Sequence, residues 1–167
     1  IVNFFKSKNR KVSYDTLSNY LGYIEEAFLA YKTERYNIKG KDVVAGNCKY
    51  YLNDLSFKNF LYPSFAYGVG YLLENAVYLE LRRLGYIVYT GSFRDKEVDF
   101  VAMKDDRVIY LQATYMLETA QTMEREYAPL LTIGDNYEKY VVSMDGVKFP
   151  SNEGVRHIQA WNLKEIL

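Results

Sequence analysis

Residues 68–116 constrain the fold more than any other part of the chain, because the spacing of their apolar residues changes once, from helical to alternating. Apolar residues first recur every three or four positions, and Gly85 then supplies a helix stop. Three alternating runs follow, and Asp105-Asp106 marks a tight turn between the second and the third. The predicted strands are residues 87–93, 96–103 and 108–116. We therefore expect a helix followed by three strands.

The rest of this segment completes an α/β pattern. Residues 118–131 have helical spacing, and residues 139–144 and 157–161 alternate like strands. Of the 167 residues, 49% are hydrophobic, which is enough to build a packed core. The order helix, three strands, helix, strand, strand predicts an α/β sandwich with a mixed central sheet.

The first part of the chain has a different pattern. Ser13 or Asp15 is a suitable N-cap for a helix over residues 13–31, where apolar residues recur at helical spacing. The predicted elements after this helix are a strand at 31–38, a turn at 39–41 and a returning strand at 48–52. A helix followed by a two-stranded ribbon is typical of the second half of a winged helix.

Pro63 and Ser64 interrupt the pattern between these two parts of the chain. We therefore predict two units, a partial winged helix over residues 1–60 and an α/β domain over residues 61–167. Because the chain begins Ile1-Val-Asn without a methionine, we interpret it as a fragment of a longer polypeptide.

Strand alternation predicts which side chains share a surface in the α/β domain. On the second strand, Glu97, Asp99 and Val101 are expected on one face. The opposite face is expected to carry Val98, Phe100 and Ala102. A hairpin turning at Asp105-Asp106 would bring Asp99 close to Gln112 and Thr114 on one surface, with Glu74 of the preceding helix at its edge.

This arrangement resembles the PD-(D/E)XK nuclease superfamily, in which a helix precedes a hairpin that bears Asp and then Glu-x-Lys. The resemblance implies that Asp99 takes the aspartate position and Glu74 that of the acidic residue often supplied by the first helix. Gln112 takes the glutamate position and Thr114 the lysine position. In such nucleases the carboxylates hold Mg²⁺ or Mn²⁺ and the lysine assists the attacking water.

Two of the three central groups are therefore neutral in this chain. Gln112 keeps an oxygen but has no charge, and Thr114 cannot supply an ammonium group. Lys104 or Arg125 could in principle replace the missing lysine. We therefore expect Glu74, Asp99, Gln112 and Thr114 to form a degenerate catalytic site, in which Asp99 and Glu74 are the only candidate metal ligands.

Nearly the whole chain also resembles the C-terminal region of bacterial and archaeal AAA-type ATPases, where a winged helix leads into a nuclease-like domain of unknown function. The stretches that carry this resemblance are residues 20–29, 35–41, 49–54, 73–75, 97–100 and 124–131. It implies an ATPase module in the parent chain as one partner. No phosphate-loop motif occurs in these residues, so ATP and its Mg²⁺ are expected only in that missing module.

The basic residues before the first predicted helix raise the possibility of DNA binding. These residues are Lys6, Lys8, Arg10 and Lys11. In a winged helix they would contact phosphates while the helix enters the major groove. The polar face of that helix opposes this reading, since Asp15, Glu25 and Glu26 would repel phosphates. The chain as a whole has 21 basic and 21 acidic residues, so it has no general excess of positive charge.

Composition narrows the remaining possibilities. The chain has no apolar run long enough to cross a membrane and no signal peptide at its start, so we expect a cytoplasmic location without a membrane partner. The single Cys48 excludes an intramolecular disulfide and fits a reducing compartment. His157 has no second histidine or cysteine partner for a zinc site and is predicted to be structural.

Three hypotheses for function follow. The first is a non-catalytic recognition module that presents a nuclease-like surface to an unknown protein or nucleic acid. The second is a divalent-metal-dependent nuclease with a relocated base. The third is DNA binding by the winged-helix segment. The neutral residues at Gln112 and Thr114 favour the first.

Overall fold

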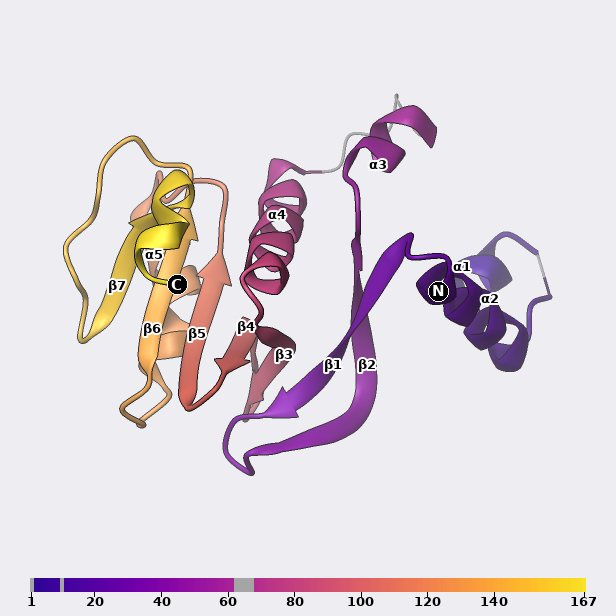
Figure 1. Ribbon diagram of the computed structural model, residues 1–167, viewed down its shortest axis with the longest axis horizontal. Helices are drawn as coiled ribbons and strands as arrows, with labels where there is room; N and C mark the ends of the chain where they lie inside the picture. The colour runs from indigo at the N-terminus through magenta and orange to yellow at the C-terminus, as the bar shows by residue number, and fades with distance from the viewer. Residues whose placement is uncertain (1, 10, 62–67) are drawn as a thin grey trace.

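The computed structural model describes residues 2–9, 11–61 and 68–167, which form one seven-stranded sheet with helices on both of its faces (Figure 1). The strand order is β2-β1-β3-β4-β5-β6-β7. Neighbouring strands are antiparallel in the pairs β1/β2, β3/β4 and β4/β5, and parallel in the pairs β1/β3, β5/β6 and β6/β7. The predicted α/β class with a mixed sheet is confirmed.

The elements follow the order expected from the sequence, with three short helices added. The helices are α1 (Val2–Ser7), α2 (Tyr14–Glu26), α3 (Ser56–Leu61), α4 (Val69–Arg83) and α5 (Ala120–Leu131), followed by the 3-10 helix η1 (Ala160–Glu165). The strands are β1 (Ala30–Asn37), β2 (Asp42–Leu52), β3 (Ile87–Phe93), β4 (Lys96–Lys104), β5 (Arg107–Ala113), β6 (Glu138–Ser143) and β7 (Val155–Gln159).

Local signals placed most of these elements correctly. Ser13 caps α2 by accepting a hydrogen bond from the Thr16 backbone, and Gly85 takes a positive φ of 88° just after α4. The helix predicted over residues 13–31 is too long, because the chain turns at Phe28, which has a φ of 55°, and then enters β1. The helices α1, α3 and η1 were not predicted.

Each face of the sheet has its own apolar core. On one face, α4 packs on Phe100, Ala102, Ile109 and Leu111 of the central strands. On the other face, α5 packs on Val98, Val101, Tyr110 and Val141. The sheet is therefore the middle layer of three, which is visible in Figure 1 as α4 and α5 on opposite sides of the central strands.

The sheet continues across the domain boundary predicted at residue 60. Residues 35–37 of β1 pair in parallel with residues 90–92 of β3, so the N-terminal hairpin extends the sheet of the α/β part. In a winged helix the same hairpin would form a separate ribbon. The structure therefore joins residues 30–52 to the predicted second unit, and side chains of β2 can reach α4.

A bulge in β4 changes the predicted assignment of side chains to faces. Tyr89 pairs with Val101 and Gly91 with Val98, so two residues of β4, Asp99 and Phe100, lie opposite the single residue between Tyr89 and Gly91. Val98 and Val101 consequently both pack toward α5, while Phe100 packs toward α4. The prediction that Asp99 shares a face with Val101 was wrong, because strict alternation does not hold across a bulge.

Within the described part of the chain, no helix is both long and apolar enough to cross a membrane.

Candidate functional site

A side-chain clamp holds the end of β2 against α4. The Asn75 amide of α4 donates to the Leu52 carbonyl at 2.9 Å and accepts the Leu52 backbone N–H at 2.8 Å. Next to it, the Tyr51 ring stacks on Tyr78 of α4 with ring centroids 4.2 Å apart. These two contacts place Lys49 and Tyr51 beside the middle of α4.

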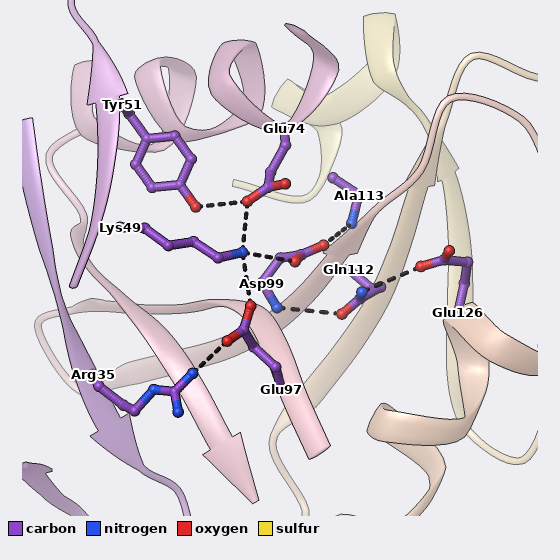
Figure 2. Close-up of polar contacts among 9 residues, drawn as sticks. All are labelled: Arg35, Lys49, Tyr51, Glu74, Glu97, Asp99, Gln112, Ala113 and Glu126. Atoms are coloured by element: carbon purple, nitrogen blue, oxygen red, sulfur yellow. Dashed lines mark hydrogen bonds and ion pairs between the residues drawn. The ribbon is translucent and has the colours of Figure 1, made fainter. Parts of the chain in front are cut away.

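Lys49 lies at the centre of three carboxylates, and we call this group the Lys49 cluster (Figure 2). Its ammonium nitrogen is 2.9 Å from Glu74 Oε1, 2.9 Å from Glu97 Oε1 and 3.4 Å from Asp99 Oδ1. The four side chains come from β2, α4 and β4. The cluster therefore exists only because the N-terminal hairpin belongs to the sheet.

Further donors fix the carboxylates of the cluster. The Tyr51 hydroxyl donates to Glu74 Oε1 at 2.8 Å, and Arg35 of β1 pairs with the other oxygen of Glu97. Asp99 Oδ2 accepts the Ala113 backbone N–H at 3.0 Å. Each carboxylate thus has two partners, one of which is its own and one of which is Lys49. Lys49 is therefore the cation that all three carboxylates share.

The electrostatics of the cluster favour a charged Lys49 and a partly protonated Asp99. Burial, together with the nearby negative charge of Glu74, raises the pKa of Asp99 to about 7, although Lys49 and the Ala113 N–H act in the opposite direction. Burial alone would lower the pKa of Lys49, but the charges of Asp99 and Glu74 outweigh it and raise this pKa above its ordinary value. The ammonium is therefore retained.

Gln112 lies beside Asp99 but uses its side chain on the other face of the sheet. Its Oε1 accepts the Asp99 backbone N–H at 3.2 Å, and its Nε2 donates to Glu126 Oε2 of α5 at 3.2 Å. Arg125 donates twice to the other oxygen of Glu126, at 2.9 and 2.7 Å. The prediction that Asp99 and Gln112 share one surface was wrong, because the β4 bulge turns the Asp99 carboxylate toward α4.

The other candidate residues lie outside the Lys49 cluster. Thr114 is buried just after β5, where its backbone N–H donates to Val142 of β6. Of the proposed replacements for the lysine, Lys104 donates to the Leu84 carbonyl and Arg125 binds Glu126. Glu74 and Asp99 are the two predicted residues that the structure brings to one cation.

Lys49 is the residue that the sequence did not reveal. The stretch around it was predicted only as a returning strand, and nothing in its local pattern indicated a partner 50 residues away. The pairing of β1 with β3 is the missing information, since it adds β1 and β2 to the sheet that contains β4, where β2 contacts α4.

A divalent cation does not fit between the carboxylates of the Lys49 cluster while the Lys49 ammonium lies between them. The point that Glu74, Glu97 and Asp99 share is occupied by the Lys49 ammonium at 2.9–3.4 Å, which is hydrogen-bond distance and leaves no space between the oxygens for an ion. In the described residues, no three histidine, cysteine or acidic side chains are grouped as metal ligands. Glu74 and Asp99 could ligate a metal only after Lys49 moved away.

The basic residues predicted to contact DNA are described only in part. Lys8 and Lys11 are exposed before α2, whereas the Lys6 side chain and the whole of Arg10 lie outside the described residues. Their role in DNA binding stays a prediction.

Two proteins of known sequence are similar to this chain. An uncharacterized protein of Haemophilus influenzae is 36% identical over 143 residues, which cover 86% of this chain and 35% of that protein. An uncharacterized protein of Methanocaldococcus jannaschii is 33% identical over 130 residues, which cover 75% of this chain and 28% of that protein. The chain thus spans about a third of the length of these relatives. No protein-family profile and no solved structure matches it.

Proposed function

We propose that this chain is a non-catalytic recognition module with a PD-(D/E)XK nuclease-like fold. The observation that carries the proposal is the position of Lys49, whose ammonium lies among the carboxylates that would hold a metal in a nuclease. A lysine at this point replaces the metal with a cation that belongs to the chain.

Gln112 supports the same conclusion, because its neutral amide is required by its surroundings. It must accept from the Asp99 N–H and donate to Glu126, and a carboxylate could do only the first. The residue at the glutamate position of the nuclease motif is thus adapted to hold the sheet and α5 together. We further propose that the module acts within an AAA-type ATPase, as its sequence resemblance implies.

The second candidate is a divalent-metal-dependent nuclease in which Lys49 is the relocated base. One observation favours it, namely that Lys49 contacts both Glu74 and Asp99, the two groups expected to ligate the metal. This candidate requires Lys49 to leave the carboxylates when metal binds. The two candidates therefore differ in a measurable property, the affinity of the unmodified protein for Mg²⁺ or Mn²⁺.

Calorimetric titration with Mn²⁺ and Mg²⁺ tests the proposal. The unmodified chain should show no binding in the millimolar range, and it should not cleave single- or double-stranded DNA or RNA. Lys49→Met should acquire divalent-cation binding, since it leaves three carboxylates without their cation. Lys104→Met is the matched control, because this lysine binds a backbone carbonyl outside the cluster.

One result would overturn the proposal in favour of the nuclease. Manganese-dependent cleavage by the unmodified chain, abolished both by Asp99→Ala and by Lys49→Met, would show that the cluster is catalytic. Cleavage that survives Asp99→Ala would instead indicate a contaminating enzyme, and a preparation free of it would have to give no cleavage.

A further inference from the structure

The strand β2 forms one edge of the sheet, and over half of its length it lacks the charged residues and prolines that usually protect an edge. Within the described residues its only strand neighbour is β1, and residues 43–48 contain neither a charged residue nor a proline. At the opposite edge, β7 has 5 residues, and Val155 exchanges two backbone hydrogen bonds of 2.9 Å with Asn152 of the preceding loop. With 11 residues, β2 is the more open edge.

The clamp at the end of β2 shows which backbone groups of this strand point outward. The Leu52 N–H and C=O bind the Asn75 amide, in the way that they would bind the backbone of a further strand. In an antiparallel pair, every second residue points its backbone groups away from the neighbouring strand. Tyr50 is two residues from Leu52 in the same unbroken register with β1, so its N–H and C=O also point outward. In the described part of the chain, no side chain binds these two groups of Tyr50.

A bulge beside Tyr50 opens a pocket along the same edge. The register of β2 on β1 is interrupted after Lys49, and residues 45–48 lie opposite the single residue Glu34. These four residues line a pocket of about 760 Å³, which we call the α2-side pocket. Its other wall is α2, which contributes Tyr14, Leu17, Ser18 and Leu21.

A second pocket lies on the opposite face of this edge. It has a volume of about 440 Å³ and lies between β2, α3 and α4, and we call it the α4-side pocket. Lys49 and Tyr51 point to this face, because they contact side chains of α4. The Tyr50 ring therefore points to the α2 face, and Tyr50 lines both pockets. The apolar side chains of the α4-side pocket include Leu52, Leu55 and Leu72.

We propose that the outer edge of β2 binds an extended polypeptide segment of a partner, which adds a strand to the sheet. The segment exchanges two hydrogen bonds with Tyr50, as Asn75 does with Leu52. Neighbouring side chains of an extended segment point to opposite faces, so they enter the two pockets in turn. Since both pockets have apolar walls, the segment carries large apolar side chains at consecutive positions. This inference rests on the proposed function, because it names the partner class of a recognition module.

An NMR titration of the labelled 167-residue chain with the heptapeptide amide acetyl-Lys-Thr-Val-Leu-Phe-Thr-Lys tests the proposal. The peptide should shift the Tyr50 amide signal and the methyl signals of Leu21 and Leu72, one from each pocket, with a single dissociation constant. An analogue with N-methyl groups on its Leu and Phe amides should bind at least about twofold more weakly, because it lacks a hydrogen bond. Adjacent N–H groups of a strand point to opposite edges, so one of the two always faces β2.

Variants of Tyr50 test the same hydrogen bond from the side of the protein. Tyr50→Pro removes the outward N–H, and proline is tolerated on an edge strand where that group faces solvent. Tyr50→Val is the matched control for the loss of the ring, and Tyr23→Val removes an exposed tyrosine of α2 that lines neither pocket. Tyr50→Pro should bind at least about twofold more weakly than Tyr50→Val, and Tyr23→Val should bind like the unmodified chain. If Tyr50→Pro does not fold, the N-methylated peptide decides.

Three results would overturn the proposal. The first is equal affinity for the two peptides, or no binding in the millimolar range. The second is a set of shifted signals confined to one pocket, which would indicate a site for a single side chain. The third is dimerisation of the unmodified chain in sedimentation velocity that is kept in Tyr50→Val and lost in Tyr50→Pro, because the partner of the edge would then be β2 of a second copy.

Failure of this inference is distinguishable from failure of the proposed function. No binding of the heptapeptide, together with no binding of Mn²⁺ and no cleavage, would refute the added strand and leave the non-catalytic module intact. Binding of the heptapeptide at Tyr50 by a chain that also cleaves nucleic acid with Mn²⁺ would support the added strand and refute the non-catalytic proposal.

Discussion

The molecule contains two groups of interacting polar side chains of very different character, the Lys49 cluster on the α4 side and a second group between β6 and β7. The second group consists of Ser143, Asp145 and His157, and we call it the Ser143 network. Its three residues are 0%, 6% and 1% exposed, whereas the Lys49 and Glu97 side chains of the first group are 29% and 41% exposed. One group reaches the surface and the other is sealed.

The Ser143 network contains the residue types of a hydrolase triad, but its hydrogen bonds run in the opposite direction. His157 Nδ1 accepts the Phe149 backbone N–H at 3.0 Å, so the proton of the neutral ring is on Nε2 and points to Ser143 Oγ at 2.8 Å. Ser143 in turn donates to Asp145 Oδ2 at 2.6 Å. A catalytic serine gives its proton to histidine, whereas this serine gives its proton to aspartate.

The comparison teaches that the direction of hydrogen bonds separates a structural group from a candidate site. In the Ser143 network every donor has an acceptor, and Asp145 also accepts the Leu117 N–H at 2.9 Å. The group thus ties β6, β7 and the start of the α5 segment together, which agrees with the structural role predicted for His157. In the Lys49 cluster, three acceptors depend on one side chain, so removal of that side chain changes all of them.

The largest expected effect comes from Lys49→Met. It keeps the aliphatic stem but leaves Glu74, Glu97 and Asp99 without their shared cation. Breaking a fully buried pair costs about 3–5 kcal/mol, and the partial exposure of this cluster reduces the expected loss of unfolding free energy to about 2–4 kcal/mol. Urea denaturation at neutral pH measures this loss of unfolding free energy. A loss equal to that of Lys104→Met would show that Lys49 does not stabilise the three carboxylates.

Gln112→Glu should give the next largest effect, although it restores the residue type of an active nuclease. The new carboxylate could not donate a hydrogen bond to Glu126. Two negative charges would then face each other where the Gln112 Nε2 now lies 3.2 Å from Glu126 Oε2. We expect a loss of about 2 kcal/mol, typical of an unpaired buried charge. The double variant Gln112→Glu with Glu126→Gln should recover stability. No recovery would mean that the hydrogen bond between the Gln112 amide and Glu126 does not contribute to stability.

The extent to which the sequence predicted these features follows the range of the interactions involved. The Ser13 cap, the Gly85 stop and the boundaries of β3 were predictable, because each depends on neighbours within a few residues. The pairing of β1 with β3 was not, since it joins residues 35–37 to residues 90–92 without a local signal. Lys49 was missed for that reason.

The predicted assignment of β4 side chains to the two faces of the sheet failed for a different physical reason. Alternation correctly predicted that Glu97 and Asp99 lie together, and both contact Lys49. It failed one residue later, because the bulge at Asp99 and Phe100 adds a residue with no mark in the sequence. Glu74 was predicted at the edge of the site because the helical spacing of α4 continues without interruption.

A smaller effect is expected for Ser143→Ala in the sealed network. Removal of the hydroxyl leaves the His157 Nε2–H without its acceptor and takes one of the donors from Asp145, while Leu117 still donates to that carboxylate. An unsatisfied buried group of this kind costs about 1–2 kcal/mol. Urea denaturation of Ser143→Ala beside the unmodified chain measures this loss. An unfolding free energy equal to that of the unmodified chain would show that the Ser143 network does not stabilise the fold.

A pH dependence of stability with opposite sign is expected in the two groups. Burial raises the pKa of Asp99 to about 7, so its folded form holds a proton more tightly than the unfolded chain does. Its contribution to stability is therefore fully present below the unfolded pKa of about 4 and is lost as the pH rises through about 7. Burial lowers the pKa of His157, so its contribution is fully present above about pH 6.5 and is lost as the pH falls below that value.

Between about pH 5 and 7, comparison of each variant with the unmodified chain reports mainly these two slopes, because ionisable groups distant from the replaced residue cancel in the difference. Relative to Asp99→Asn, the unmodified chain should lose stability as the pH rises through this window. Relative to His157→Gln, it should lose stability as the pH falls. The same sign in both differences would contradict this prediction, because burial disfavours the charged form of each group, and the charged form is the deprotonated one in Asp99 and the protonated one in His157.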